Sequence, residues 1–387
     1  MKKTFRSSSL RPLLVSIVAI LFGFLVGSIL LIASGQNPIQ CFIALFKGGL
    51  SSKERIFNTF SNAIPLVFTG LSVTFAYKTG LFNIGATGQM VAAGLLSVIT
   101  ALTVDLPRPL LLPLVVLVGF LGGAVYGGIQ GYLKSRFNVN EVVSGIMMNW
   151  IAHWAVYYVI SDYFKSSSMA TESQSVPAAA SLRSDLLLSF TGSSSFNWGF
   201  ILAIACVVIV QYILRRTVIG YEMRAVGFNA EAAEYGGINV KKNAVLSMAI
   251  AGGLSAAGAS LYYLSGNTEF FWSTYQSLPA IGFNGIPVAM LASCNPIGII
   301  FTALFMSMLD ISGLQLTNLT AYNEYITNVI IAVIVYLSAF SLVIKMWIGK
   351  LGKKKDDGAD ANAEPAPAAA SAPAGAQAET EKGDDAK

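Results

Sequence analysis

Long apolar runs separated by short polar segments dominate the chain. A bilayer core about 30 Å thick needs about 20 apolar residues for each helical crossing, and most of the runs reach that length. They cover residues 13–33, 60–77, 84–104, 110–133, 142–160, 198–214, 244–264, 278–292, 296–316 and 326–344, of which the eighth is short. The pattern predicts an all-α integral membrane protein with about ten transmembrane helices.

The basic residues indicate how these helices are oriented. If the N-terminus is cytoplasmic and each run crosses once, most of the 25 lysines and arginines fall on the inner side. Because basic residues beside membrane helices gather in the cytoplasm, this predicts an N-in, C-in topology with an even number of crossings. The composition agrees, with 54% hydrophobic and 12% charged residues. Orientation also accounts for the net charge, so no nucleic-acid partner is expected.

The polar segments divide the chain into regions. We expect a transmembrane domain over residues 1–352, with a Ser- and Ala-rich external loop at 161–197 and a long cytoplasmic loop at 215–243. Residues 353–387 are rich in Ala, Pro, Asp, Glu and Gly and contain no aromatic residue. Such a segment cannot bury enough apolar surface to fold, so a disordered cytoplasmic tail is predicted there.

Glycines recur on one face of the fourth predicted helix. Gly119, Gly123, Gly127 and Gly131 are spaced four residues apart. Small residues at that spacing let two helix backbones approach closely in lipid. We therefore expect this face to pack against another helix inside the bundle.

The cytoplasmic loop contains the signals of a short helix. Asn229 is a candidate N-cap, and Glu231 lies in the first turn, where the helix dipole favours an anion. Gly236 and Gly237 would end the helix. A short helix lying across this loop is therefore predicted.

The residues give no support for an enzyme. The chain has one histidine, and it lacks the GxSxG, HExxH, paired-carboxylate and paired-cysteine patterns and the GxxxxGK[ST] phosphate loop. Its three cysteines stand singly, as packing residues do. No metal or cofactor is expected in this chain, and it is not expected to hydrolyse ATP.

Two clusters of helix-breaking residues interrupt the apolar runs, at 78–89 and at 282–287, and each places Phe-Asn beside glycine. Transporters often break helices at matching points of two halves to line the substrate site, although a tight turn uses the same residues. Helices two to five run opposite to helices seven to ten, which allows an inverted repeat. Polar residues inside membrane helices are also pathway candidates, or else bond to neighbouring helices. The candidate pathway residues are Phe82, Asn83, Thr87, Gln89, Asn149, Phe283, Asn284 and Asp310.

Four segments carry a resemblance to a known family. They read GLFNIGATGQM at 80–90, NEVVSGIMMNWIA at 140–152, RAVGFNAEAAEYGGINV at 224–240 and GFNGIPVAMLASCNPIGII at 282–300. The chain resembles the permeases of the branched-chain amino acid and sugar superfamily of ABC importers, and most closely the nucleoside-type permeases. One residue departs from that pattern, because Thr87 stands where nucleoside-type permeases usually carry an acid.

The resemblance implies a permease subunit in a bacterial inner membrane. An external solute-binding lipoprotein would deliver the solute, a separate ATPase subunit would bind ATP and magnesium, and a second permease would complete a heterodimer. The short cytoplasmic helix would couple to the ATPase through Arg224, Asn229, Glu231, Ala232, Ala233, Glu234, Tyr235, Gly236 and Gly237. The rivals are a sugar or branched-chain amino acid permease and a secondary transporter or channel. The last of these would use Asp310 as its ion-coupled carboxylate.

Overall fold

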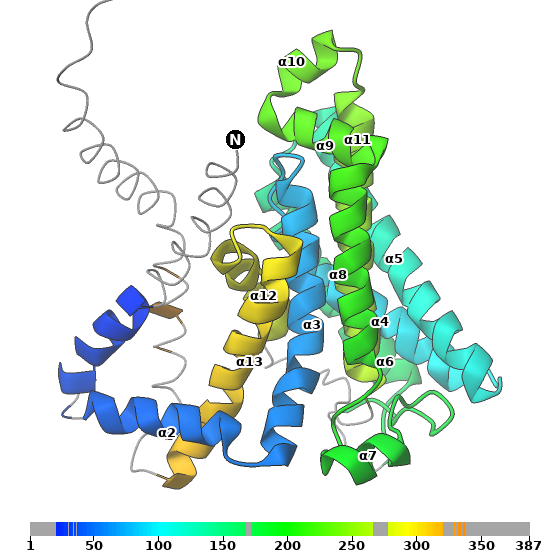
Figure 1. Cartoon of the computed structure of the whole chain (residues 1–387). Helices are drawn as coiled ribbons and strands as arrows, with labels where there is room; N and C mark the ends of the chain where they lie inside the picture. The colour runs from blue at the N-terminus through cyan, green and yellow to red at the C-terminus, as the bar shows by residue number, and fades with distance from the viewer. Residues whose placement is uncertain are drawn as a thin grey trace, which may run out of the picture. The chain divides into compact units, whose positions relative to one another are not determined.

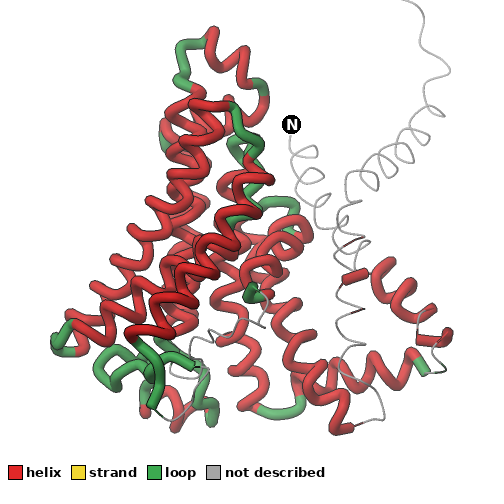
Figure 2. Tube along the Cα trace, turned by 180° about the vertical axis from the view of Figure 1, so that it is seen from behind, coloured by secondary structure: helices red, strands yellow, loops and turns green. Residues whose placement is uncertain are grey.

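The computed structural model describes residues 21–29, 31–33, 35, 37–167, 172–265, 278–319, 329, 332–333 and 336. They belong to the first of two compact units, residues 1–344, and are helices joined by loops (Figure 2). The predicted tail at 353–387 and most of the last predicted helix lie outside the described residues. The named helices are α2 (Pro38–Leu50), α3 (Lys53–Tyr77), α4 (Ala86–Thr103), α5 (Arg108–Phe137), α6 (Glu141–Tyr163), α7 (Asp185–Thr191), α8 (Gly199–Arg216), α9 (Val218–Phe228), α10 (Ala230–Tyr235), α11 (Val240–Tyr263), α12 (Ala280–Leu291) and α13 (Pro296–Leu319).

Six of the described helices are long and apolar enough to cross a membrane: α3, α4, α5, α8, α11 and α13. This confirms an all-α membrane protein. The eighth predicted run forms α12, which has 12 residues. At 1.5 Å per residue that helix is about 18 Å long, too short to cross a bilayer alone. Three described helices, α2, α7 and α9, do not correspond to any apolar run or helix that the sequence predicted.

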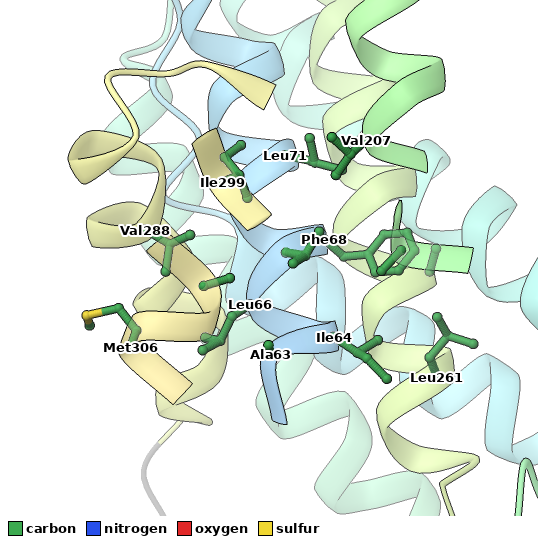
Figure 3. Close-up of a cluster of buried hydrophobic side chains, with 14 of the residues drawn as sticks. Ala63, Ile64, Leu66, Phe68, Leu71, Val207, Leu261, Val288, Ile299 and Met306 are labelled. Carbon is green, nitrogen blue, oxygen red and sulfur yellow. The ribbon is translucent and has the colours of Figure 1, made fainter. Parts of the chain in front are cut away.

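Helix α3 lies at the centre of the bundle. It packs against α8 and α11 on one side and against α12 and α13 on the other. Figure 3 shows Phe68 of α3 between these groups, with Leu261 of α11 on one side and Val288 of α12 on the other. Because almost all of its side chains from Ala63 to Ala76 are buried, α3 is surrounded by protein along most of its length.

The glycine face of α5 packs directly on α11, as predicted. A side chain on Gly131 would lie 2.8 Å from the Cα of Val245, and one on Gly127 would overlap the carbonyl oxygen of Met248. Neither position has space for a real side chain, so the two backbones are in contact. Glycine is therefore required for this approach. The rest of α5 is largely exposed, as at Leu117 and Leu121, so the helix packs on the bundle by its glycine face and does not lie inside it.

The predicted short helix with its Asn229 cap is confirmed. The side chain of Asn229 accepts a hydrogen bond from the backbone N–H of Ala232 at 2.9 Å and so caps α10. After α10, Gly237 adopts a left-handed backbone with φ of 81°. Helix α10 lies at one end of the bundle and α7 at the other (Figure 1).

Candidate functional site

Four uncharged polar side chains form a hydrogen-bonded cluster inside the bundle. Asn83 and Gln89 exchange two amide hydrogen bonds, at 2.9 and 3.1 Å. Asn83 also donates to the hydroxyl of Ser72 at 2.9 Å, and Gln89 donates to the side-chain oxygen of Gln130 at 2.6 Å. All four are completely buried. Burying an unpaired amide is costly, and these bonds satisfy the amides of Asn83 and Gln89. The Nε2 of Gln130 has no hydrogen-bond partner among the described residues.

The turn between α3 and α4 brings two members of this cluster into place. The chain leaves α3 at Tyr77 and turns at Gly80, which has φ of 78°. Gly85 precedes α4, and a side chain there would occupy the space of the Gln130 amide. Gly85 therefore lets α5 supply its glutamine to the cluster.

Asn149 fastens the start of α4 to α6. Its side-chain oxygen accepts a hydrogen bond from the backbone N–H of Gly88 at 2.7 Å, and its amide nitrogen donates to the carbonyl of Ile84 at 3.2 Å. Both ends of the amide are therefore bound to the protein. In this conformation Asn149 holds the start of α4 against α6, and its amide is not free to bind a solute.

The two glycine-containing clusters of the sequence lie against each other. A side chain on Gly282 would lie 2.5 Å from the Cα of Thr87, and one on Gly285 would lie 2.5 Å from the Cβ of Thr69. Helix α12 thus packs closely on the start of α4 and the middle of α3. The Thr87 hydroxyl is completely buried and has no hydrogen-bond partner among the described residues.

A pocket opens beside this contact, between α6 and the start of α12. Its volume is about 250 Å³. It is lined by Ile146, Asn149, Trp150, Leu278 and Phe283. Two predicted pathway residues, Asn149 and Phe283, therefore share one pocket, whose lining carries no ionisable group.

The remaining predicted pathway residues are placed differently. Phe82 and Asn284 are half-buried. Asp310 lies on α13 one turn from Ser307, whose hydroxyl bonds to the carbonyl of Thr59 at 2.8 Å. Thr59 and Ser72 are separated by about 20 Å along α3 at 1.5 Å per residue. Asp310 is therefore not part of the polar cluster.

The end of the bundle that carries α10 has a second recess. Its volume is about 620 Å³, and its wall includes Lys134, Arg136 and Lys241 with the α9–α10 joint. Phe228 and Tyr235, on either side of α10, are each 95% exposed. Of α10 itself only Ala233 is buried, so this helix projects from the end of the bundle (Figure 1).

Lys78 lies behind this recess, directly after α3. Burial lowers the pKa of its ammonium group; Cys294 opposes that shift, while Arg215 and Arg224 add to it. Arg224 itself bonds within α9, to the carbonyl of Gly220 at 3.1 Å. Of the predicted coupling residues, Arg224 therefore lies on α9 and the others on or beside α10.

Gln130, Ser72 and Trp150 were not among the predicted site residues. Gln130 had a usable signal, because it is a polar residue inside an apolar run and lies between Gly127 and Gly131 on the packed face. Trp150 had none, because tryptophan is common in membrane helices. Among the described residues, no group of His, Cys, Asp or Glu could hold a metal ion.

Comparison with known families gives one match over most of the bundle. Residues 55–339 match the family described as branched-chain amino acid transport system, permease component.

Individual relatives cover nearly the whole chain. The nucleoside ABC transporter permease protein NupB of Lactococcus lactis subsp. cremoris is 38% identical over 88% of this chain and 94% of its own length. The guanosine ABC transporter permease protein NupP of Bacillus subtilis is 33% identical over 89% of this chain and 98% of its own length. The glucose ABC transporter permease protein TsgB13 of Haloferax volcanii is 27% identical over 77% of this chain and 79% of its own length.

Proposed function

The chain belongs to the family of branched-chain amino acid transport system permease components, and from this we propose that it is the permease subunit of an ABC importer that translocates a nucleoside. The observation that carries the proposal is the 38% identity to a nucleoside permease over 88% of this chain. A second relative, the guanosine ABC transporter permease protein NupP, is 33% identical over 89% of this chain. Transport subunits of this family move a solute and do not transform it.

The interior of the bundle supports a neutral solute. The polar cluster of Asn83, Gln89, Gln130 and Ser72 is uncharged, and so is the lining of the pocket beside α12. A nucleoside is neutral near pH 7 and combines an aromatic ring with hydroxyl groups. Such a solute needs apolar and hydrogen-bonding contacts rather than a charged partner.

Energy would enter through α10. We propose that this helix, with the exposed Phe228 and Tyr235 at its ends, docks on a separate ATPase subunit that binds ATP and magnesium. Glu222 of α9 accepts a hydrogen bond from Asn243 of α11 at 3.0 Å. Because α11 packs on α3, α4 and α5, movement of α9 and α10 would reach the centre of the bundle.

The proposed assembly contains further partners. A second, different permease would pair with this chain, and an external solute-binding lipoprotein would deliver the solute in the bacterial inner membrane. These partners rest on the resemblance to nucleoside-type importers. The multi-pass helical architecture is consistent with that location.

A sugar is the second candidate solute. The observation in its favour is the 27% identity to a glucose permease over 77% of this chain. Sugars are also neutral, so the uncharged lining does not distinguish them from nucleosides. The nucleoside is preferred because NupB and NupP are more similar to this chain than TsgB13 and cover more of it.

The proposal can be tested by purification and binding. The full chain, tagged after Lys387, should co-purify from mild detergent with an ATPase and a second permease, and the complex should hydrolyse ATP. Thermal shift of the cognate binding protein should then show stabilisation by nucleosides and not by glucose or leucine. A chain that purifies alone and transports solute in liposomes without ATP would contradict the proposal.

A further inference from the structure

Two tryptophans stand among aliphatic residues on the exposed face of α6. Trp150 and Trp154 are each about half exposed, beside exposed Met147 and Ile151. The ring of the buried His153 lies 5.7 Å from the ring of each tryptophan.

The position of these residues excludes an interfacial aromatic belt. Counting 1.5 Å per residue from Glu141, Trp150 lies about 14 Å along α6 and His153 about 18 Å along it. Both are therefore near the middle of a helix of 23 residues. Aromatic belts form at the two membrane interfaces, whereas ionisable residues within spans face the bundle interior or a water-filled cavity. His153 is buried and so faces the bundle interior, whereas Trp150 lines a pocket.

The pocket beside α12 opens on the same face. Trp150 and Phe283 are two of its five lining residues, and its volume is about 250 Å³. Small-molecule sites usually enclose about 300–1,000 Å³. Trp150 is 46% exposed, so part of its ring is free to contact a molecule that the pocket does not fully enclose. The dimensions fit one part of a solute, with the rest of the site supplied from the open side.

Hydrogen-bonding groups at the pocket come from α12 rather than from Asn149, whose amide is engaged by Gly88 and Ile84. Pro279 gives α12 no side-chain cap, and the N–H of Gly282 bonds to the carbonyl of Pro279 at 3.3 Å, so within the described part of the chain the N–H groups of Ala280 and Ile281 are left for an acceptor. The buried and unpartnered hydroxyl of Thr87 lies against Gly282, outside the pocket lining. The two N–H groups lie in sequence between Leu278 and Phe283, which line the pocket.

We propose that this pocket is the chain's part of the solute-binding site and that it holds the base of a nucleoside. This rests on the proposed function. The flat, neutral base lies against Trp150 and Phe283, and acceptor atoms on its edge meet the N–H groups at the start of α12. Aromatic side chains bind every base because each base has a π face. The ribose then faces the open side of the pocket.

The test is transport by the complete complex in proteoliposomes, with its binding protein and ATPase. Replacing a stacking aromatic residue by alanine costs about 1–3 kcal/mol per base, which is about a 5- to 150-fold loss of affinity. Trp150→Ala should therefore raise the apparent KM for nucleoside uptake by about that factor, and Trp150→Phe should restore most of it. Trp154→Ala, one turn along the exposed face and outside the pocket lining, is the matched control and should leave the KM near wild type.

Photolabelling gives a second measurement that does not depend on a folded variant. An azidopurine nucleoside, irradiated with the wild-type complex, should label the peptides that contain Trp150 or Phe283, and excess free purine base should prevent the labelling while ribose should not. Labelling confined to other helices would overturn the pocket assignment.

Each failure has its own pattern. If the wild-type complex takes up no nucleoside, the proposed function is wrong. If it takes up nucleosides but Trp150→Ala and Phe283→Leu leave the KM unchanged, only the base pocket is wrong. A third outcome is that Trp150→Ala lowers the recovery of the second permease while the complexes that still assemble keep the wild-type KM. In that case the α6 face is a permease interface, and the base pocket is again wrong.

Discussion

Gly227, at the end of α9, lies directly against Gly80 in the turn that follows α3. A side chain on Gly80 would lie 3.4 Å from the Cα of Gly227, and one on Gly227 would overlap the carbonyl oxygen of Lys78. The segment that leads into α10 therefore touches the turn that leads into the polar cluster. If α10 docks on the proposed ATPase subunit, this backbone contact gives a direct route for motion from α10 to the interior.

Gly227→Ala should interrupt that route. The added methyl group must push the α9–α10 joint away from Lys78, and overpacking of this kind costs about 1–3 kcal/mol. We expect uptake and ATPase stimulation by the binding protein to fall at least about tenfold, while basal ATPase activity and assembly persist. Gly128→Ala is the control, because its side chain would find only an ordinary contact at 3.6 Å. Full stimulation in Gly227→Ala would show that the contact transmits nothing.

The paired amides of Asn83 and Gln89 should be energetically coupled. Their two hydrogen bonds are buried, and removing one partner leaves the other unsatisfied. In a double-mutant cycle with alanine, we expect a coupling energy of about 0.5–2 kcal/mol in the free energy of unfolding, measured in mixed detergent micelles. The pair Asn83 and Thr100 should be additive, because the hydroxyl of Thr100 bonds within its own helix. A coupling near zero for Asn83 and Gln89 would contradict the geometry.

The α5–α11 contact predicts opposite effects for two adjacent glycines. Gly127→Ala should lower the melting temperature of the purified protein, because the carbonyl oxygen of Met248 leaves no space for a side chain. Gly128→Ala should hold or raise it, because alanine is favoured over glycine in helices by about 1 kcal/mol and space is available there. Equal melting temperatures for the two variants would be inconsistent with backbone contact at Gly127.

The sequence predicted what local chemistry determines and missed what distant residues create. The bounds of α10 follow from Asn229 and Gly237, which act within a few residues, and the buried face of α5 follows from a four-residue period. By contrast, Gln89 and Gln130 are 41 residues apart, and only the packing of α4 on α5 joins them. The contact of Thr87 with Gly282 likewise arises from tertiary packing, so no local pattern indicated it.

The glycine that follows α10 allows a variant and its matched control at one position. Gly237 has φ of 81° and nothing within 4 Å of an added side chain, so only backbone conformation restricts this site. Gly237→Val should distort the end of α10, since a left-handed backbone costs a branched residue about 1–2 kcal/mol or more. Gly237→Asn should be tolerated, because asparagine adopts this conformation readily.

The expected readout for Gly237→Val is loss of transport and of stimulated ATPase activity with normal membrane insertion. A bulky replacement of Glu231, such as Glu231→Tyr, should have the same effect if α10 enters a groove of the ATPase. Normal uptake in both variants would remove the coupling role of α10.

Asp310 decides between an ATP-driven importer and an ion-coupled transporter. A secondary transporter would need a carboxylate that takes up and releases an ion in the path, and Asp310 was the sequence's candidate for it. The structure places Asp310 on α13 one turn from Ser307, which bonds to Thr59 near the start of α3, away from the polar cluster and the α12 pocket. Asp310→Asn should therefore retain uptake within about threefold of wild type, which corresponds to a free-energy difference of about 0.6 kcal/mol.

Uptake by wild type and variant should stop when the ATPase is inactivated and continue when an uncoupler collapses the ion gradient in proteoliposomes supplied with ATP. Loss of uptake in Asp310→Asn together with sensitivity to the uncoupler would favour the ion-coupled mechanism, because neither result follows from an importer driven through α10.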